Sequence, residues 1–204
     1  MPNLPVSSGN PCPMLRALVA SGHVPDQGTS IKKLVETLGK ARGGDAETTR
    51  SFRKKAKIVA MAANGLWPWD IIHNAVSGVR LHKLRDGPLD KHGVGSGILN
   101  ARAEVVAAEL DRLNDFASPK TDASGASEPG LDAAQIVAFM DANFARAAGR
   151  RRKIDRKLMD GEWPVLLEIL GKPSAQGLYL SVSEVRALFV SLALPERIEA
   201  RLVG

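Results

Sequence analysis

The spacing of hydrophobic residues along most of this chain predicts helices. Apolar side chains recur every three or four residues, as in Ile31, Leu34, Val35 and Leu38, and few stretches alternate with a period of two. Aromatic residues, which strands favour, make up only 4% of the chain. The helices predicted in this way cover residues 13–21, 31–40, 47–64, 69–79, 101–116, 131–148, 163–170, 182–191 and 195–202. The pattern therefore predicts an all-α fold.

Two segments lack the helical pattern. Residues 81–98 contain Gly93, Gly95 and Gly97 and are expected to form a long irregular loop, a kind of segment that is often functional. Residues 117–130 are rich in Ser, Pro, Gly and Asp, which predicts a flexible loop. At 204 residues, 44% of them hydrophobic, the chain is long enough to enclose one core. We therefore expect one compact multi-helix domain over residues 1–204.

The composition limits where the protein is expected to be located and what it is expected to bind. The chain has one cysteine, so no internal disulfide can form and the reducing cytoplasm is the expected location, with secretion of a processed form as the alternative. No apolar run approaches the roughly 20 residues that span a bilayer, so no membrane partner is expected. The formal net charge of +6 predicts attraction to an anion, which leaves open nucleic acid, an acidic surface and the propionates of a haem.

The single cysteine lies at a predicted helix start. Cys12 is flanked by Pro11 and Pro13 and is followed by an apolar helical run. Proline is favoured as the first residue of a helix, where its missing N–H leaves no bond unmade, so Pro13 is expected to begin the helix and Cys12 to cap it. The exposed N–H groups and the peptide dipoles at that end favour a thiolate over a thiol. Cys12 is therefore a candidate metal ligand or nucleophile, although a lone cysteine is often an inert core residue.

The residues around Cys12 resemble the opening of a known family. Asn10-Pro11-Cys12-Pro13, an apolar helix, Gly22-His23-Val24-Pro25-Asp26, Gly28 and a capped helix occur in that order. This order resembles the haem-thiolate peroxidases, the family of chloroperoxidase and the unspecific peroxygenases, with weaker similarity at residues 83–94 and 180–195. The resemblance implies a chloroperoxidase-like all-α fold and one haem b. Cys12 would be the axial ligand to its iron, with Pro11 and Pro13 beside it in the cofactor site.

The resemblance is incomplete on the other face of the haem. The family has Glu-His-Asp or Glu-Gly-Asp after His-Gly-Val, residues that bind magnesium, whereas this chain has Gly95-Ser96-Gly97-Ile98. Without those carboxylates we do not expect a magnesium site. The family's catalytic glutamate is also missing, which leaves Asp141 on the predicted helix 131–148 as the candidate acid. His92 is a second candidate for moving protons, weighed against a role as polar surface.

A basic run at residues 150–157 supports an alternative function. Its Arg and Lys residues could neutralise phosphates, but no zinc-ligand spacing or aromatic stacking surface accompanies them, so nucleic acid is the less favoured partner. The sequence favours a haem-thiolate peroxidase or peroxygenase that uses hydrogen peroxide to oxidise a small organic molecule. The alternatives are a haem-binding or interaction protein without catalysis and a basic helical nucleic-acid-binding protein.

Overall fold

The computed structural model describes residues 4–65, 68–85, 87, 89–90 and 93–204, and the chain divides into two compact units. Unit 1 comprises residues 1–90 together with 192–204, and unit 2 comprises residues 91–191. Unit 1 contains helices α1 (Pro13–Ala20), α2 (Ile31–Arg42), α3 (Ala46–Ala62), α4 (Pro68–Ser77), the 3₁₀ helix η1 (Leu81–Lys83) and α11 (Glu196–Val203). Unit 2 contains α5 (Ala107–Asp111), α6 (Leu113–Phe116), β1 (Ser118–Thr121), β2 (Ser127–Asp132), α7 (Ala133–Arg146), α8 (Asp155–Met159), α9 (Trp163–Leu170), β3 (Lys172–Ser174), β4 (Gly177–Ser181) and α10 (Val182–Val190).

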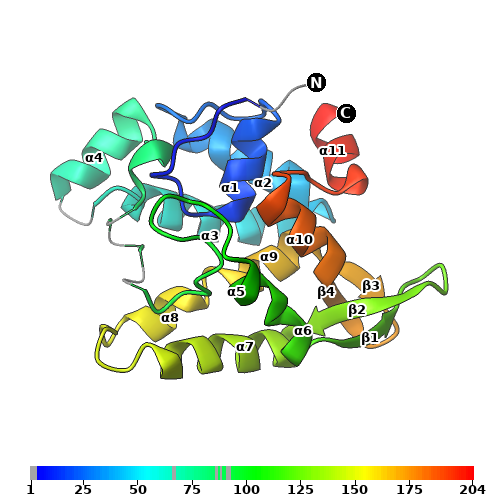
Figure 1. Cartoon of the computed structure of the whole chain (residues 1–204). Coiled ribbons are helices and arrows are strands. Elements are labelled where there is room, and N and C mark those ends of the chain that lie inside the picture. The colour runs from blue at the N-terminus through cyan, green and yellow to red at the C-terminus, as the bar shows by residue number, and fades with distance from the viewer. Residues whose placement is uncertain (1–3, 66–67, 86, 88, 91–92) are drawn as a thin grey trace. The chain divides into compact units, whose positions relative to one another are not determined.

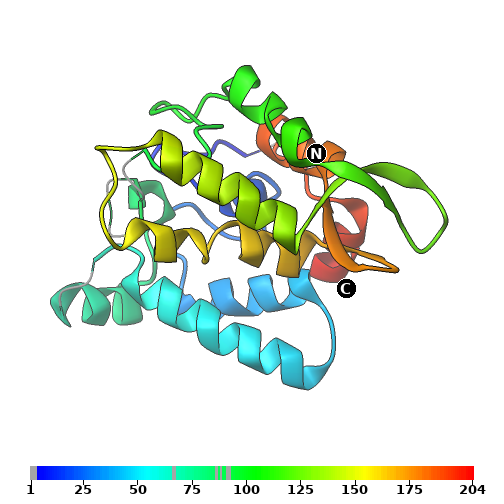
Figure 2. The same cartoon turned by 90° about the horizontal axis from the view of Figure 1, so that it is seen from below.

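Unit 1 is built around the buried helix α1. Met14, Ala17 and Leu18 on this helix are at most 2% exposed, so α1 forms the core of the unit rather than a surface layer. Helices α2 and α3 run side by side in opposite directions, joined by a short turn (Figures 1 and 2). Ser30 and Asp45 begin these two helices by accepting hydrogen bonds from backbone N–H groups of the first turn.

The predicted all-α fold is wrong, because unit 2 contains a four-stranded antiparallel sheet in the order β1-β2-β4-β3 (Figure 1). The segment 117–130, expected to be a flexible loop, forms β1 and most of β2. Its three-to-six-residue strands contain proline, which normally argues against a strand. Here Pro119 and Pro173 lie on the two edge strands, and Pro129 precedes the part of β2 that pairs with β4. The prolines therefore cost few ladder hydrogen bonds.

Unit 2 contains two copies of one local arrangement of helices and strands. A helix, a β-hairpin and a second helix follow one another as α6-β1-β2-α7 and again as α9-β3-β4-α10. In each copy the last strand residue caps the second helix: Asp132 accepts a bond from the backbone of Gln135, and Ser181 accepts one from the backbone of Glu184. The second strands of the two copies pair with each other. The two hairpins thus complete one another's sheet.

The core of unit 2 is aromatic and aliphatic. Phe139 is fully buried on α7, with its ring 5.4 Å from that of Phe116 and 4.9 Å from that of Trp163, both in edge-on contact. Leu131 and Leu180 face each other across β2 and β4 and are at most 1% exposed. Buried aromatic rings and branched side chains of this kind supply most of the stabilisation of a small core.

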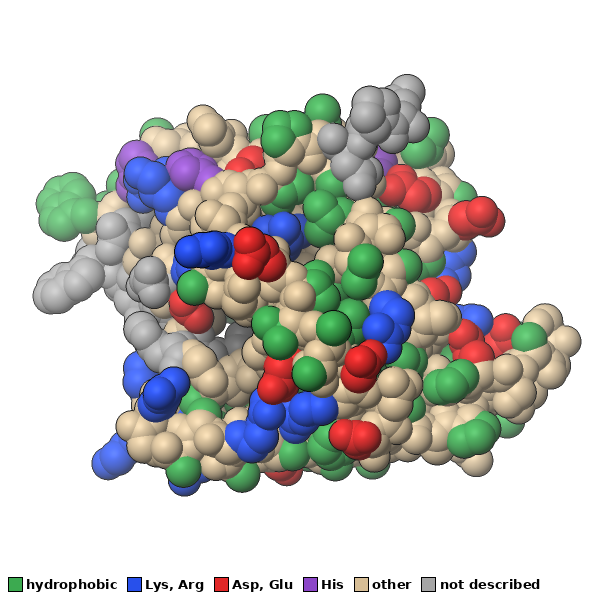
Figure 3. Space-filling view, in the orientation of Figure 1, with side chains coloured by type: hydrophobic (Ala, Val, Ile, Leu, Met, Phe, Trp, Pro, Cys, Tyr) green, Lys and Arg blue, Asp and Glu red, His purple; other side chains and the backbone are tan. Residues whose placement is uncertain are grey.

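The two units differ in charge. Unit 1 contains 15 Lys and Arg residues against 9 Asp and Glu, whereas unit 2 contains 13 of each, so the whole net charge belongs to unit 1. Acidic and basic side chains of unit 2 lie beside one another over α5, α6 and α7 (Figure 3). There Glu109 pairs with Arg112 and Arg146 at 2.9 and 2.7 Å. Within the described residues no helix has the length and apolar character needed to cross a membrane.

Candidate functional site

Cys12 occupies the N-cap position of α1, and Pro13 is the first residue of the helix, as the sequence predicted. The amides of Met14 and Leu15 follow, at a helix end where no earlier turn provides carbonyl acceptors. The partial positive charge of such an end stabilises an anion near the cap. The half-buried sulfur of Cys12 therefore lies at a position that favours the thiolate.

A buried asparagine and a buried arginine fix the chain before Cys12. Asn10 is fully buried, and its side-chain oxygen accepts a hydrogen bond from the backbone N–H of Cys12 at 3.3 Å. One nitrogen of the Arg16 guanidinium donates to the carbonyl groups of Ser7 and Asn10, both at 3.2 Å. The backbone N–H of Arg16 also donates to the carbonyl of Cys12 at 2.9 Å. Arg16 thus ties the segment before Cys12 to the first turn of α1.

Arg16 also brings a positive charge close to Cys12. Its side chain lies one helical turn after the cysteine, and the residue is only 9% exposed. Burial lowers the pKa of Arg16, the neighbouring positive charge of Arg85 lowers it further, and the carboxylate of Asp26 raises it. A guanidinium keeps its proton under all ordinary conditions, so this charge is permanent. It adds to the field of the helix end, which favours a thiolate at Cys12.

Three buried polar atoms around this segment have no hydrogen-bond partner among the described residues: Asn10 Nδ2, Arg16 Nε and Asp26 Oδ1. Such atoms are uncommon, because an unpaired buried donor or acceptor costs about 1–3 kcal/mol. Two of the three are N–H donors next to a cysteine that favours the anionic form. The donor types of this group, one thiol and two N–H donors, match in chemistry the iron and the carboxylates of a haem, but neither of the cavities described below is lined by Cys12, Asn10 or Arg16.

The two prolines of the motif, predicted to lie in the cofactor site, constrain the backbone on both sides of Cys12. Pro11 is half-buried and Pro13 is buried, and neither has an N–H to donate. Each ring fixes one backbone dihedral angle, so the chain is stiff on both sides of Cys12. Pro11, Cys12 and Pro13 therefore form one rigid segment of unit 1.

Asp141, the predicted acid, lies on the surface of α7 in unit 2. Its side chain is 59% exposed, and its Oδ1 accepts a hydrogen bond from Arg156 at 2.8 Å. Arg156 also binds Asp160 at 2.7 Å. Asp141 is therefore engaged in a solvent-exposed ion-pair network, and the structure does not bring it together with Cys12 in one unit. His92, the other candidate, lies outside the described residues.

The basic run at residues 150–157 is partly neutralised by its own neighbours. Arg152 binds the fully buried carboxylate of Asp155 at 2.6 Å, and Arg156 holds the two aspartates described above. The guanidinium of Arg151 lies 4.5 Å from the ring centre of Phe144 and donates to that residue's carbonyl group. Half of the run thus has a structural role, which weakens the nucleic-acid alternative at this segment.

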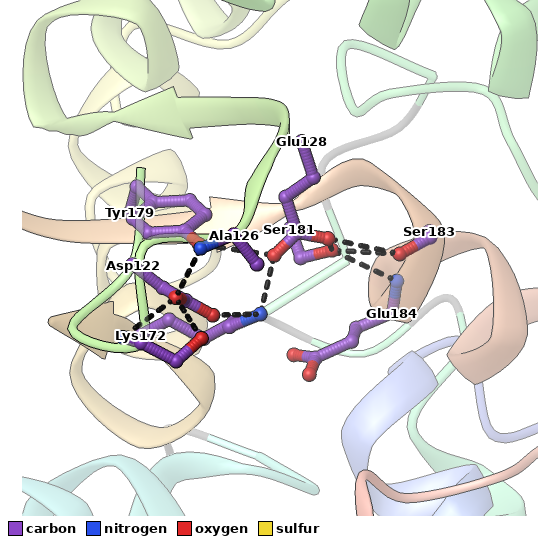
Figure 4. A network of polar contacts seen from close by, with 9 residues as sticks. Asp122, Ala126, Glu128, Lys172, Tyr179, Ser181, Ser183 and Glu184 are labelled. Carbon is purple, nitrogen blue, oxygen red and sulfur yellow. Dashed lines mark hydrogen bonds and ion pairs between the residues drawn. The ribbon is translucent and has the colours of Figure 1, made fainter. Parts of the chain in front are cut away.

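A second polar cluster, which the sequence did not indicate, joins the two hairpins of unit 2. Glu128 on β2 lies at its centre (Figure 4). Its carboxylate accepts bonds from Lys172 at 2.5 Å, Tyr179 at 2.9 Å and Ser181 at 2.5 Å. Lys172 also lies 3.4 Å from Asp122. Because Glu128 and Asp122 fall in the segment expected to be a loop, no sequence pattern connected them with residues some fifty positions later.

The charges of this cluster stabilise one another. Bonds from Ser124 are the largest of the effects that lower the pKa of Asp122 to about 2. Burial raises the pKa of Glu128, but bonds from Lys172, Ser181 and Tyr179 outweigh it and hold that pKa below its usual value. The bond to Glu128 raises the pKa of Lys172. Glu128 is therefore an anion whose acceptor positions are already filled, which suits a structural tie and leaves no free base for catalysis.

Two shallow cavities are described here, and neither is lined by Cys12 or Asp141. One, of about 360 Å³, lies between α6 and the first hairpin and includes Glu128. The other, of about 210 Å³, lies beside His23, which binds Glu199 of α11 at 2.7 Å. In the part of the chain that the structure describes, no three His, Cys, Asp or Glu side chains converge as a metal site would require.

Comparison with known proteins adds no family to this description. No protein-family model, curated protein or solved structure matches the chain. Among the described residues, the arrangement around Cys12 is the strongest candidate site.

Proposed function

We propose that this chain binds haem b through the thiolate of Cys12 and, in the haem-bound form, uses hydrogen peroxide to oxidise or oxygenate a small organic molecule. One observation carries the proposal. Cys12 caps a buried helix, with the positive charge of Arg16 one turn away and unused donors on Asn10 and Arg16 beside it. A helix N-terminus and a nearby guanidinium both favour the thiolate form of a cysteine.

The residues of the chain would position and stabilise the ligand. Pro11 and Pro13 hold the backbone of Cys12, and the bonds of Arg16 to Ser7 and Asn10 keep the segment against α1. The field of the helix end and of Arg16 keeps the sulfur anionic. A bound haem would supply peroxide activation, which electron donation from a thiolate ligand promotes.

A second candidate is haem binding without peroxide chemistry. A specific observation favours it, because Asp141 is exposed and bound by Arg156. In addition, Gly95-Ser96-Gly97-Ile98 provides no carboxylate where the resembled family has two. Peroxide chemistry needs a group that takes a proton from one peroxide oxygen and returns it to the other. The two candidates share the Cys12 ligand and differ only in this acid.

Absorption spectroscopy of the purified chain, with haem added, tests haem ligation by Cys12, which both candidates share. We expect the reduced protein with carbon monoxide to show the strongly red-shifted main band that thiolate ligation gives. Cys12→Ser should abolish that band, whereas Cys12→His should retain haem but give an unshifted band. Circular dichroism checks that each variant is folded. Failure of the folded wild type to take up haem, or an identical spectrum for Cys12→Ser, would overturn the proposal.

Peroxide turnover separates the two candidates. With a small phenolic substrate, a peroxidase should show turnover that depends on both hydrogen peroxide and Cys12. The second candidate predicts the thiolate spectrum without such turnover. Because the spectrum is recorded separately, loss of turnover alone would remove the first candidate and leave the second.

A further inference from the structure

Helix α3 exposes a row of cations. The side chains of Arg50, Lys54 and Lys57 are exposed and make no hydrogen bond or ion pair with the residues that the structure describes. At about 100° per residue these three side chains lie within about 60° of one another around the helix. The buried residue Phe52 lies on the opposite side, where α3 packs against α2. The row therefore faces away from the core of unit 1.

The next helix, α4, exposes an apolar stripe. Trp69, Ile72 and Val76 are 79%, 52% and 82% exposed, and their spacing of three and then four residues places them on one face of the helix. A hydrophobic side chain protrudes at the left of Figure 3, in the region where α4 lies in Figure 1. Ile58, at the end of α3, is 63% exposed. A cluster of large exposed apolar residues usually marks an interaction surface.

The basic row and the apolar stripe lie on two helices that follow one another in the chain. Helices α3 and α4 are consecutive and in contact, and Figure 2 shows them following one another along the same edge of unit 1. Cations next to exposed Trp, Ile and Val side chains are the combination by which a helix binds the interface of an anionic bilayer. Nucleic acid would be attracted by the cations but would gain little from aliphatic side chains on a neighbouring helix.

We propose that α3 and α4 form a surface that binds anionic lipid bilayers, with the α3 cations contacting headgroups and Trp69, Ile72 and Val76 entering the interface. Such binding needs no helix that crosses the membrane, so it is compatible with the lack of one among the described residues. It is also independent of Cys12, because none of the residues involved belongs to the haem site proposed above.

Sedimentation with lipid vesicles tests the proposal on the full chain. The protein should sediment with vesicles of phosphatidylcholine that contain phosphatidylglycerol and should stay in solution with phosphatidylcholine alone. Binding should weaken as salt is added, because ions screen the cations. The fluorescence of Trp69 should shift to shorter wavelength on binding, and Trp69→Ala should remove that shift.

Two matched variants assign the binding to this surface. R50Q/K54Q/K57Q should weaken binding by about a hundredfold, since each cation near an anionic surface contributes about fivefold. R150Q/K153Q/K157Q removes the same number and type of charges from exposed positions of unit 2 and should leave binding nearly unchanged. I72S/V76S keeps every charge, and it should also weaken binding.

Three results would overturn the proposal. One is a failure of the wild type to bind the anionic vesicles, and another is equal loss of binding in the two charge variants. The third is tight binding to a short DNA duplex that R50Q/K54Q/K57Q abolishes and I72S/V76S does not, together with weak vesicle binding. That result would assign the basic row of α3 to nucleic acid.

Discussion

Unit 1 and unit 2 are similar in size but differ in net charge and in how many of their charged side chains form ion pairs. In unit 2, which has no net charge, carboxylates such as Glu109, Glu128 and Asp155 each bind one or more basic side chains. Unit 1 holds the whole excess of positive charge, and the cations of α3 have no partner among the described residues. Buried donors without a partner among the described residues occur in both units, at Asn10 and Arg16 in unit 1 and at Asn143 in unit 2.

We interpret this difference in charge pairing as a difference in role: unit 2 is a structural scaffold, and unit 1 contains the binding regions. Charges that are already paired contribute modestly to stability and leave nothing for a ligand. Unpaired buried donors and unpaired exposed cations reduce stability or give no benefit to the fold, so their presence is easier to explain by a partner. Both proposals, the haem at Cys12 and the anionic surface at α3, concern residues of unit 1, which holds the excess of positive charge.

The largest change in the free energy of unfolding is expected from a substitution in the core of unit 2. Phe139→Ala should lower the free energy of unfolding by about 3–5 kcal/mol, because a fully buried aromatic ring is removed from contact with Phe116 and Trp163. Urea unfolding followed by circular dichroism measures it. Val137→Ala on the same helix, at an exposed position, should change stability by less than about 0.5 kcal/mol. A folded Phe139→Ala protein that had lost haem affinity would break the distinction between scaffold and binding region.

Arg16 should affect both stability and haem affinity. Arg16→Met removes the bonds to Ser7 and Asn10 and should lower the free energy of unfolding by about 1–3 kcal/mol. Loss of the residue that positions a ligand typically weakens metal binding about tenfold or more, and we expect that loss for haem. Haem titration measures it, with Arg16→Lys, which keeps the charge, as the control. Wild-type haem affinity in a folded Arg16→Met protein would remove Arg16 from the site.

Acid should destabilise unit 2 before unit 1. Asp122, with a pKa of about 2, and Glu109, Glu128 and Asp132, with lowered pKa values, all lie in unit 2. Because these values lie below those of an unfolded chain, the carboxylates stabilise the fold at neutral pH, and that contribution is lost as pH falls from about 4 to about 2. Urea unfolding at several pH values should show it. Asp122→Asn should flatten the dependence, and an unchanged profile in this variant would contradict the expectation.

The smallest change in stability is expected from a substitution of Asp141. Asp141→Asn breaks an exposed ion pair with Arg156 and should cost no more than about 0.5 kcal/mol. Peroxide turnover, where present, should also be unaffected, because the carboxylate is engaged on the surface of unit 2. A steady-state assay measures this, and a large fall in turnover with unchanged stability would restore Asp141 as the acid.

The sequence predicted the helices well because their signals are local. Pro13 marks a helix start by its own chemistry, and the predicted range 163–170 matches α9. The predicted helix 101–116 was too long, since only α5 and α6 in its second half are helical. Cys12 could be located from the sequence for the same reason, because a cap and its helix are neighbours in the chain.

The sheet could not be predicted because its strands depend on distant partners. Strands of three to six residues that contain Pro119, Pro129 and Pro173 have almost no strand propensity of their own. They form because β2 pairs with β4, some fifty residues later. The buried donors of Asn10 and Arg16 were equally hidden, since only the folded chain shows which polar atoms lack a partner.

X-ray absorption at the iron edge of the haem-loaded chain tests the central claim most directly, because it identifies the atoms bound to iron. The account predicts one sulfur neighbour in the wild type, which should be absent in a folded Cys12→Ser variant. Only nitrogen and oxygen neighbours in the wild type, or a sulfur neighbour that persists in Cys12→Ser, would contradict it.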